Sequence, residues 1–86
     1  MLKFVNNKTM KTLDKLNFEA TMLKNPRIRC VSDQINGKTF ALCLMATDDK
    51  NDRRIQRHIS FYMKPKELTA FIWGYYECMT NHKVLD

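Results

Sequence analysis

The chain has 86 residues, a length that allows one domain with one small hydrophobic core. Its 15 Lys and Arg against nine Asp and Glu give a formal net charge of +6. This surplus favours a polyanionic partner, nucleic acid ahead of an anionic membrane surface, with a merely soluble basic domain as the alternative.

The N-terminus lacks a signal-peptide pattern, and no apolar run approaches the roughly 20 residues of a membrane span. The three cysteines are an odd and sparse set, unlike the paired framework of a small secreted domain. We therefore expect a cytoplasmic protein with no membrane partner.

Residues 7–25 favour a helix by their Lys, Leu, Met, Ala and Glu content, with Asn25-Pro26 as its end. The predicted core-facing stripe of this helix is Met10, Leu13, Leu16, Ala20 and Leu23. Residues 17–23 also alternate as a strand would, and Phe18 and Met22 fall outside the helical stripe. We choose the helix and leave the strand as the alternative.

Residues 27–34 and 39–47 read as a hairpin around Asn36-Gly37, a pair typical of a type I′ turn. A two-residue turn puts Ile35 opposite Lys38, and therefore Cys30 opposite Cys43 and Val31 opposite Leu42. In this register Arg27 and Arg29 share the face of Phe40, Leu42 and Leu44, so the sequence does not decide which face the helices cover.

After a polar loop, residues 55–63 read as a third strand. Its predicted core side carries Ile55, Ile59, Phe61 and Met63, and its other side carries Arg54, Gln56, His58, Ser60, Tyr62 and Lys64. Arg57 falls on the apolar side. A bulge would turn it outward; otherwise it reaches round the edge or pairs with Asp33 or Glu19.

Residues 64–82 read as a second helix, with Pro65 at the first helical position and Glu67 at the positive end of the helix dipole. Its predicted sheet-facing stripe is Leu68, Phe71, Ile72, Tyr75 and Met79. Trp73 and Tyr76 lie off that stripe or at its margin. We predict a protein interface there, with Trp73 packed beneath the first helix as the alternative.

The chain is thus a single α+β domain over residues 1–86 with the order α-β-β-β-α, a three-stranded antiparallel meander between two helices. This order, with Lys64 and Lys66 in "MKPKEL", resembles the double-stranded RNA-binding domain. The resemblance implies RNA contacts from the first helix, the first hairpin loop and the start of the last helix. The family's Gly-Pro-x-His loop and Lys-Lys-x-Ala-Lys run are absent from the sequence.

In size, charge and Lys and Asn content the chain also resembles small basic early proteins of T-even-like phages. That resemblance implies an anti-defence protein or antitoxin that binds a host component, such as an RNA-binding inhibitor of the RNase of a type III toxin pair.

Catalytic motifs are missing from the sequence around His58 and His82, so we expect a protein that is not an enzyme and needs no cofactor. The aspartates of residues 48–52 lack the spacing of a calcium loop. Cys78 and His82, four residues apart, could join Cys30 and Cys43 in a zinc site, but free cysteines are more often buried hydrophobes. We expect no metal.

The basic residues give the leading hypothesis, RNA or single-stranded nucleic acid bound by phosphate contacts, hydrogen bonds and stacking. The predicted nucleic-acid-binding residues are Arg27, Arg29, Arg53, Arg54, Arg57, His58, Tyr62, Lys64 and Lys66. Charged edge strands that prevent aggregation are the alternative reading. The second hypothesis is an inhibitor that docks on a host protein through Trp73 and Tyr76. We expect a homodimer in either case, because the core is small.

Overall fold

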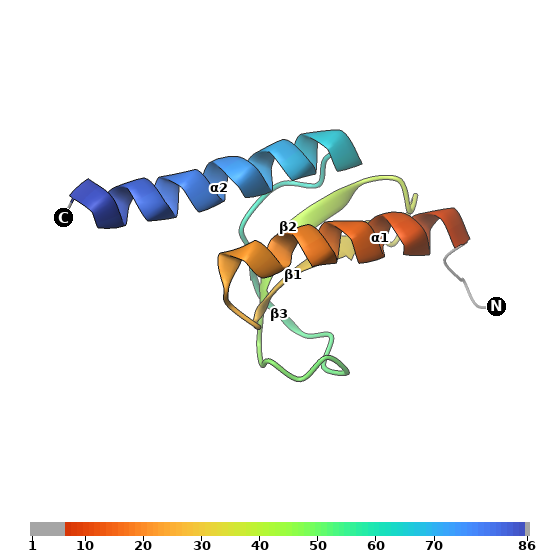
Figure 1. Ribbon diagram of the computed structural model, residues 1–86. Coiled ribbons are helices and arrows are strands. Elements are labelled where there is room, and N and C mark those ends of the chain that lie inside the picture. Colours follow the sequence, from red (N-terminus) through yellow and green to blue (C-terminus); the bar gives the residue numbers. More distant parts are fainter. Residues whose placement is uncertain (1–6, 86) are drawn as a thin grey trace.

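The computed structural model describes residues 7–85, with side chains as far as residue 80. The helical elements are α1 (Asn7–Ala20), the short 3₁₀ turn η1 (Thr21–Leu23) and α2 (Pro65–Leu85); the strands are β1 (Ile28–Ser32), β2 (Phe40–Met45) and β3 (Ile55–His58). The predicted α-β-β-β-α order is confirmed (Figure 1). Residues 1–6, where we predict no signal peptide, and the side chain of His82 lie outside the described part.

The three strands form an antiparallel sheet in the order β1-β2-β3, and both helices pack on the same face of it. Side chains from every helix and from two strands build one core, which comprises Leu16, Ala20, Leu23, Cys30, Phe40, Leu42, Leu68 and Ile72. The covered face is therefore that of Phe40 and Leu42. This settles the question that the sequence leaves open.

The first helix buries most of its predicted stripe, and the strand alternative for residues 17–23 is wrong. The prediction for Met10 is also wrong, because its side chain is 44% exposed and Thr9 is buried instead. The Thr9 hydroxyl donates a hydrogen bond of 2.9 Å to the Gly37 carbonyl, so the start of α1 packs on the β1–β2 loop rather than on apolar side chains.

The second helix begins as predicted, at Pro65. The Lys64 N–H donates to the Glu67 carboxylate at 3.0 Å, which caps the first turn. Leu68 and Ile72 are fully buried, whereas Met79 is 38% exposed. The C-terminal half of α2 extends past the sheet (Figure 1), which agrees with the exposure of Met79.

The predicted type I′ turn at Asn36-Gly37 is wrong. Gly37 has a φ of 63°, but Asn36 is not at positive φ, and a type I′ turn needs both. The Asp33 N–H donates to the Thr39 carbonyl and the Gly37 N–H donates to the Asp33 carbonyl, both at 2.9 Å, which closes a wider loop. The side chains of Asp33 and Asn36 accept hydrogen bonds from main-chain N–H groups inside the loop and stabilise it.

This wider loop moves the strand register by one residue. Cys30 lies opposite Leu42, and Arg29 lies opposite Cys43. A slip of one residue reverses the face of every side chain on a strand. The predicted Cys30–Cys43 neighbours therefore point to opposite faces, and Arg27 and Arg29 lie on the face without helices.

The predicted third strand is wrong beyond His58. Gln56 has no partner in the ladder between the pairs Arg57–Leu44 and Ile55–Met45, which is a β-bulge. At the other end the Leu42 carbonyl accepts from both Ile59 N–H and Ser60 N–H, at 2.8 and 3.1 Å.

These irregularities break the alternation that the sequence suggests. Ser60 is buried, because its hydroxyl accepts from the Leu42 N–H at 2.9 Å. Phe61, predicted in the core, is 89% exposed, while Ile59 and Met63 do pack against the core as predicted. Ile55 lies opposite Met45, on the face without helices, so that prediction is also wrong.

The two edges of the sheet differ. On β1, the side-chain amide of Asn17 accepts from the Cys30 N–H at 2.8 Å and donates to the Cys30 carbonyl at 3.3 Å. A helix side chain thus takes the place of a neighbouring strand at the centre of this edge. The outer edge of β3 has no main-chain partner among residues 7–85.

We predict that Asn17→Ala lowers the free energy of unfolding by about 1–3 kcal/mol, because the main chain of Cys30 loses both partners beneath α1. Urea unfolding followed by circular dichroism measures the change. Gln34→Ala, at an exposed loop position, is the matched control and should change stability little. Equal effects of the two substitutions would contradict this role of Asn17.

Candidate nucleic-acid interface

The face of the sheet without helices carries a row of polar side chains over a buried centre. Arg29 and His58 both lie opposite Cys43, one from each neighbouring strand. Cys43 and Met45 are nevertheless almost fully buried, at 0% and 2% exposure. The polar side chains and the β2–β3 loop therefore shield this face in place of a helix layer.

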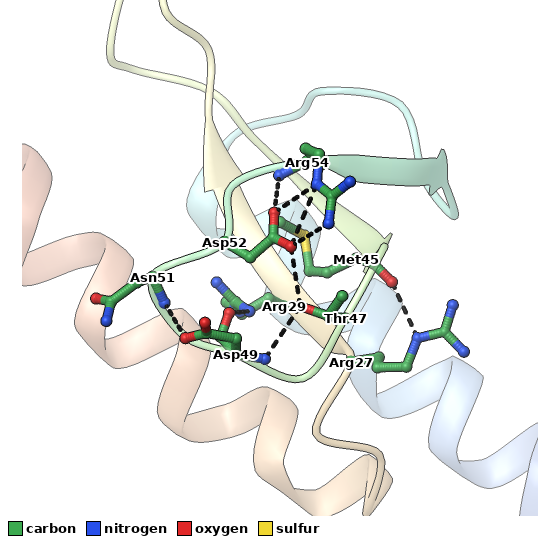
Figure 2. Close-up of polar contacts among 8 residues, drawn as sticks. All are labelled: Arg27, Arg29, Met45, Thr47, Asp49, Asn51, Asp52 and Arg54. Carbon is green, nitrogen blue, oxygen red and sulfur yellow. Dashed lines mark hydrogen bonds and ion pairs between the residues drawn. The ribbon is translucent and has the colours of Figure 1, made fainter.

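Arg27 ties the three strands together at the far end of the sheet. Its Nε donates to the Met45 carbonyl at 3.0 Å, and its Nη2 donates to the Gln56 side chain at the bulge. Figure 2 shows Arg27 turned toward Met45. The guanidinium group thus stabilises the irregular junction of β2 and β3.

Arg29 has a similar role for the β2–β3 loop, residues 46–54. Its two terminal nitrogens donate to the main-chain carbonyls of Asp49 and Lys50, at 3.1 and 3.3 Å. The loop therefore folds back toward β1 (Figure 2). The acceptors of Arg27 and Arg29 are neutral oxygens, so no carboxylate among them balances either positive charge.

Arg54 forms an ion pair with Asp52 at 2.7 Å, the only ion pair in the described part of the chain. Hydrogen bonds from the Arg54 side chain, then from its N–H and from Thr47, hold the pKa of Asp52 well below its usual range. The same pair raises the pKa of Arg54. Much of the capacity of Arg54 to bind another anion is thus used within the loop.

His58 and Tyr62 contact each other on this face. The Nε2 atom of His58 and the Tyr62 hydroxyl are 3.2 Å apart, and the rings meet edge to face with centroids 5.5 Å apart. Burial, followed by the charges that Cys43 and Asp33 carry when ionised, raises the pKa of Tyr62. Tyr62 remains 41% exposed, which leaves part of its ring accessible for stacking.

Arg53 and Arg57 are exposed and form no ion pair with any described residue. Arg57 lies opposite Leu44 at the open margin of the helix-covered face, next to the bulge. Of the explanations that the sequence offers for Arg57, a bulge is present, and the ion pairs with Asp33 and Glu19 are not formed.

Lys64 and Lys66 lie at the opposite end of the sheet from Arg53 and Arg54, because β3 runs back along β2 to the bridge between Met63 and Phe40. The nine predicted residues therefore do not form one surface. The arginines gather around the β2–β3 loop, and the two lysines stand beside the β1–β2 loop.

At the lysine end the structure has a groove of about 440 Å³ between α1, the β1–β2 loop and the start of α2. Side chains from all three segments line it, among them Lys8, Thr12, Asn36, Lys38 and Pro65. Lys64 and Lys66 flank Pro65 in the sequence. No carboxylate is among the lining residues. We call this surface the lysine groove.

The sequence prediction missed Lys8 and Lys38, which lie 30 positions apart and come together only in the fold. Two signals point to them. Lys8, Lys11 and Lys15 recur at helical spacing in α1, and the resemblance to the double-stranded RNA-binding domain names the first helix and the first hairpin loop.

The cysteines do not form the zinc site that the sequence allows as an alternative. Cys30 and Cys43 lie on opposite faces, and burial, with smaller contributions from Cys43 and Glu19, raises the pKa of the Cys30 thiol to about 12. Burial also raises the pKa of the Cys43 thiol to about 11. No three potential ligands gather around a metal position in the described residues.

Comparisons with known proteins return no match, whether to a protein-family model, a curated protein or a solved structure. No described helix is long and apolar enough to cross a membrane.

We predict that Asp52→Asn reduces the loss of folding stability at acid pH. The folded-state pKa of Asp52 lies below the value near 3.9 of an unfolded aspartate, so the ionised side chain stabilises the fold above about pH 4. This stabilisation is lost as the pH falls toward the folded-state pKa. Thermal unfolding between about pH 7 and pH 2 should show a smaller decline in Asp52→Asn than in the wild type, and Asp14→Asn should retain the full decline.

Proposed function

We propose that this protein binds RNA or single-stranded nucleic acid without catalysing a reaction, and that the lysine groove holds the phosphate backbone. The observation that supports this most directly is the convergence of three segments, distant in sequence, on one groove with lysines and no carboxylate among its lining residues. Ammonium groups at such a surface favour phosphate and release its condensed counterions.

The resemblance to the double-stranded RNA-binding domain supports the same surface, because that family uses the corresponding three segments for RNA. Lys64 and Lys66, from the start of α2, extend the groove. Thr12 and Asn36 add polar groups suited to hydrogen bonds with phosphate or sugar oxygens.

The arginine end of the sheet, which comprises Arg27, Arg29, Arg53, Arg54 and Arg57 around the β2–β3 loop, serves as a second contact with the nucleic acid in this proposal. Arg53 and Arg57 are exposed and have no described carboxylate partner, so they suit phosphate contacts directly. Arg27, Arg29 and Arg54 act mainly by holding the loop and adding long-range positive potential. His58 and Tyr62 offer rings and hydrogen-bonding groups for an unpaired base.

A cytoplasmic antitoxin or anti-defence role follows from the resemblance to small basic phage proteins. Such a role needs the RNA or protein of the target system to be present in the same compartment.

We predict that Lys8→Glu combined with Lys38→Glu lowers affinity for a fluorescein-labelled oligouridylate by about tenfold or more, since two attractive charges become repulsive. Fluorescence anisotropy over a salt series measures it. On a single strand, the slope of log K against log salt should become shallower by about 0.7 for each phosphate that the variant no longer neutralises. A labelled RNA duplex tested in parallel separates single-strand from duplex preference.

Lys15→Glu combined with Lys24→Glu is the matched control, because both residues are exposed and lie outside the groove and outside the β2–β3 loop. If the control loses as much affinity as the groove variant, binding follows net charge alone and the groove is not the site. Arg53→Glu combined with Arg57→Glu measures the contribution of the arginine end in the same assay, because neither side chain forms an ion pair in the described part of the chain.

A second candidate function is docking on a host protein through Trp73 and Tyr76. Trp73 is 50% exposed and meets Tyr76 edge to face at 6.3 Å between ring centroids, on a helix that extends past the sheet. An exposed Trp of this kind is a common centre of protein interfaces and would also serve a homodimer.

For this candidate we predict that Trp73→Ala weakens a protein complex or a homodimer while oligouridylate affinity stays unchanged. Sedimentation velocity of wild type and Trp73→Ala measures the dimer. A wild-type protein that stays monomeric at high concentration, with no host protein retained in a Trp73-dependent way, would remove this candidate.

A further inference from the structure

We propose that the outer edge of β3 binds an extended acidic segment of a partner protein as an added strand. This inference goes beyond nucleic-acid binding and lies apart from the lysine groove and the Trp73 face, although it gives a different ligand to Arg53, Arg57 and His58, which the proposed function offers to nucleic acid. It rests on two observations. Among the described residues, the main-chain groups at the outer edge of β1 are partly paired whereas those at the outer edge of β3 are not, and unpaired arginines lie beside β3.

Only one of the two edges is closed. Asn17 occupies the main-chain groups of Cys30 at the centre of β1, as described above. All four residues of β3 are exposed, and no described main-chain group pairs with its outer side. Because Ile59 N–H points to β2, the alternation of an antiparallel ladder turns the main-chain groups of His58 outward, on the C-terminal side of the bulge at Gln56.

The charges beside this edge select the partner. Arg53 and Arg57 are exposed and unmatched by any carboxylate in the described region, whereas the neighbouring Arg54 is neutralised by Asp52. A second copy of the chain would bring its own arginines against these and carries the same net charge of +6. An acidic peptide strand complements the charge of these arginines. It also carries main-chain N–H and C=O groups that can pair with the edge of β3, whereas a nucleic-acid backbone has no such row of groups.

The two faces of β3 further restrict the sequence of the added strand. Arg57 lies on the face of Leu44, whereas Ile55 and His58 lie on the face of Met45 and Cys43. Directly opposed residues of neighbouring strands share a face. The fitting segment therefore alternates acidic residues, placed beside Arg57, with apolar residues, placed beside Ile55.

The test uses a fluorescein-labelled peptide of alternating glutamate and valine, about eight residues long, with the full-length protein. Two further peptides carry N-methyl groups, one on every valine and the other on every glutamate. Only one of these two sets of amides faces β3 in a paired strand. We expect one methylated peptide to bind about tenfold more weakly than the other. Equal binding of all three peptides, or no binding at about 1 mM, overturns the proposal.

Protein variants test the same edge from the other side. His58→Pro removes an outward N–H without removing a ladder bond, and His58→Ala removes the side chain but keeps that N–H. We expect His58→Pro to bind the peptide about tenfold more weakly than His58→Ala. If His58→Pro loses its circular dichroism signal, the methylated peptides still decide.

Charge is tested by Arg57→Glu, with Lys24→Glu as the control of equal charge change. We expect only the first to weaken peptide binding, by about tenfold. If Arg57→Glu weakens oligouridylate binding and leaves the peptide unaffected, this edge serves nucleic acid and the proposal is wrong. Since the peptide assays contain no RNA, their failure would leave the proposed function of the lysine groove untouched.

Discussion

The register between β1 and β2 is the constraint on which the rest of this structure depends. It is fixed by the loop in which Asp33 pairs with Thr39, and it decides the face of every side chain on β1. In the observed register Cys30 joins Phe40 and Leu42 beneath the helices, and Arg27 and Arg29 reach the opposite face. A slip of one residue would bury two guanidinium groups beneath the helices, at a large cost in free energy. The same loop supplies Asn36 and Lys38 to the lysine groove, so one loop conformation determines both the strand register and the lining of the groove.

The arginines and the groove lysines of this small protein lie in different surroundings. Three arginines act as cross-links: Arg27 between strands, Arg29 from β1 to the β2–β3 loop, and Arg54 within that loop. A guanidinium group suits this work because its donors are fixed in a plane and can reach two acceptors at once. The lysines of the groove, by contrast, are exposed, and an ammonium group on a flexible stem suits a phosphate of variable position. The three cross-linking arginines thus stabilise the end of the sheet that carries the irregular β2–β3 loop.

The element order, both helices and the central strand could be predicted, because hydrophobic periodicity and the Pro and Gly positions fix them locally. The hairpin register could not. Asn36-Gly37 favours a two-residue turn by its own propensity, but the carboxylate of Asp33 and the amide of Asn36 offer the loop more hydrogen bonds in a wider form. The end of β3 could not be predicted for a similar reason: a side chain forms a hydrogen bond that a regular strand would form with its main chain, because the Ser60 hydroxyl accepts from the Leu42 N–H. The residues of the lysine groove were missed because Lys8 and Lys38 meet only through the Thr9–Gly37 contact. The charges in the sequence suggested a single basic surface, but β3 runs back along β2 and places Lys64 and Lys66 at the other end of the sheet from the arginines.

This division changes how the net charge of +6 bears on recognition. Long-range attraction of a polyanion depends on the whole charge distribution, so the cross-linking arginines still contribute to association rates. The salt dependence of the bound state counts only phosphates that are actually neutralised. Cations held by carbonyls, or by Asp52, cannot leave those partners without weakening the loop that they stabilise. If the protein binds nucleic acid as proposed, the number of phosphates bound should therefore follow the groove lysines with Arg53 and Arg57, and fall below the number that the composition suggests.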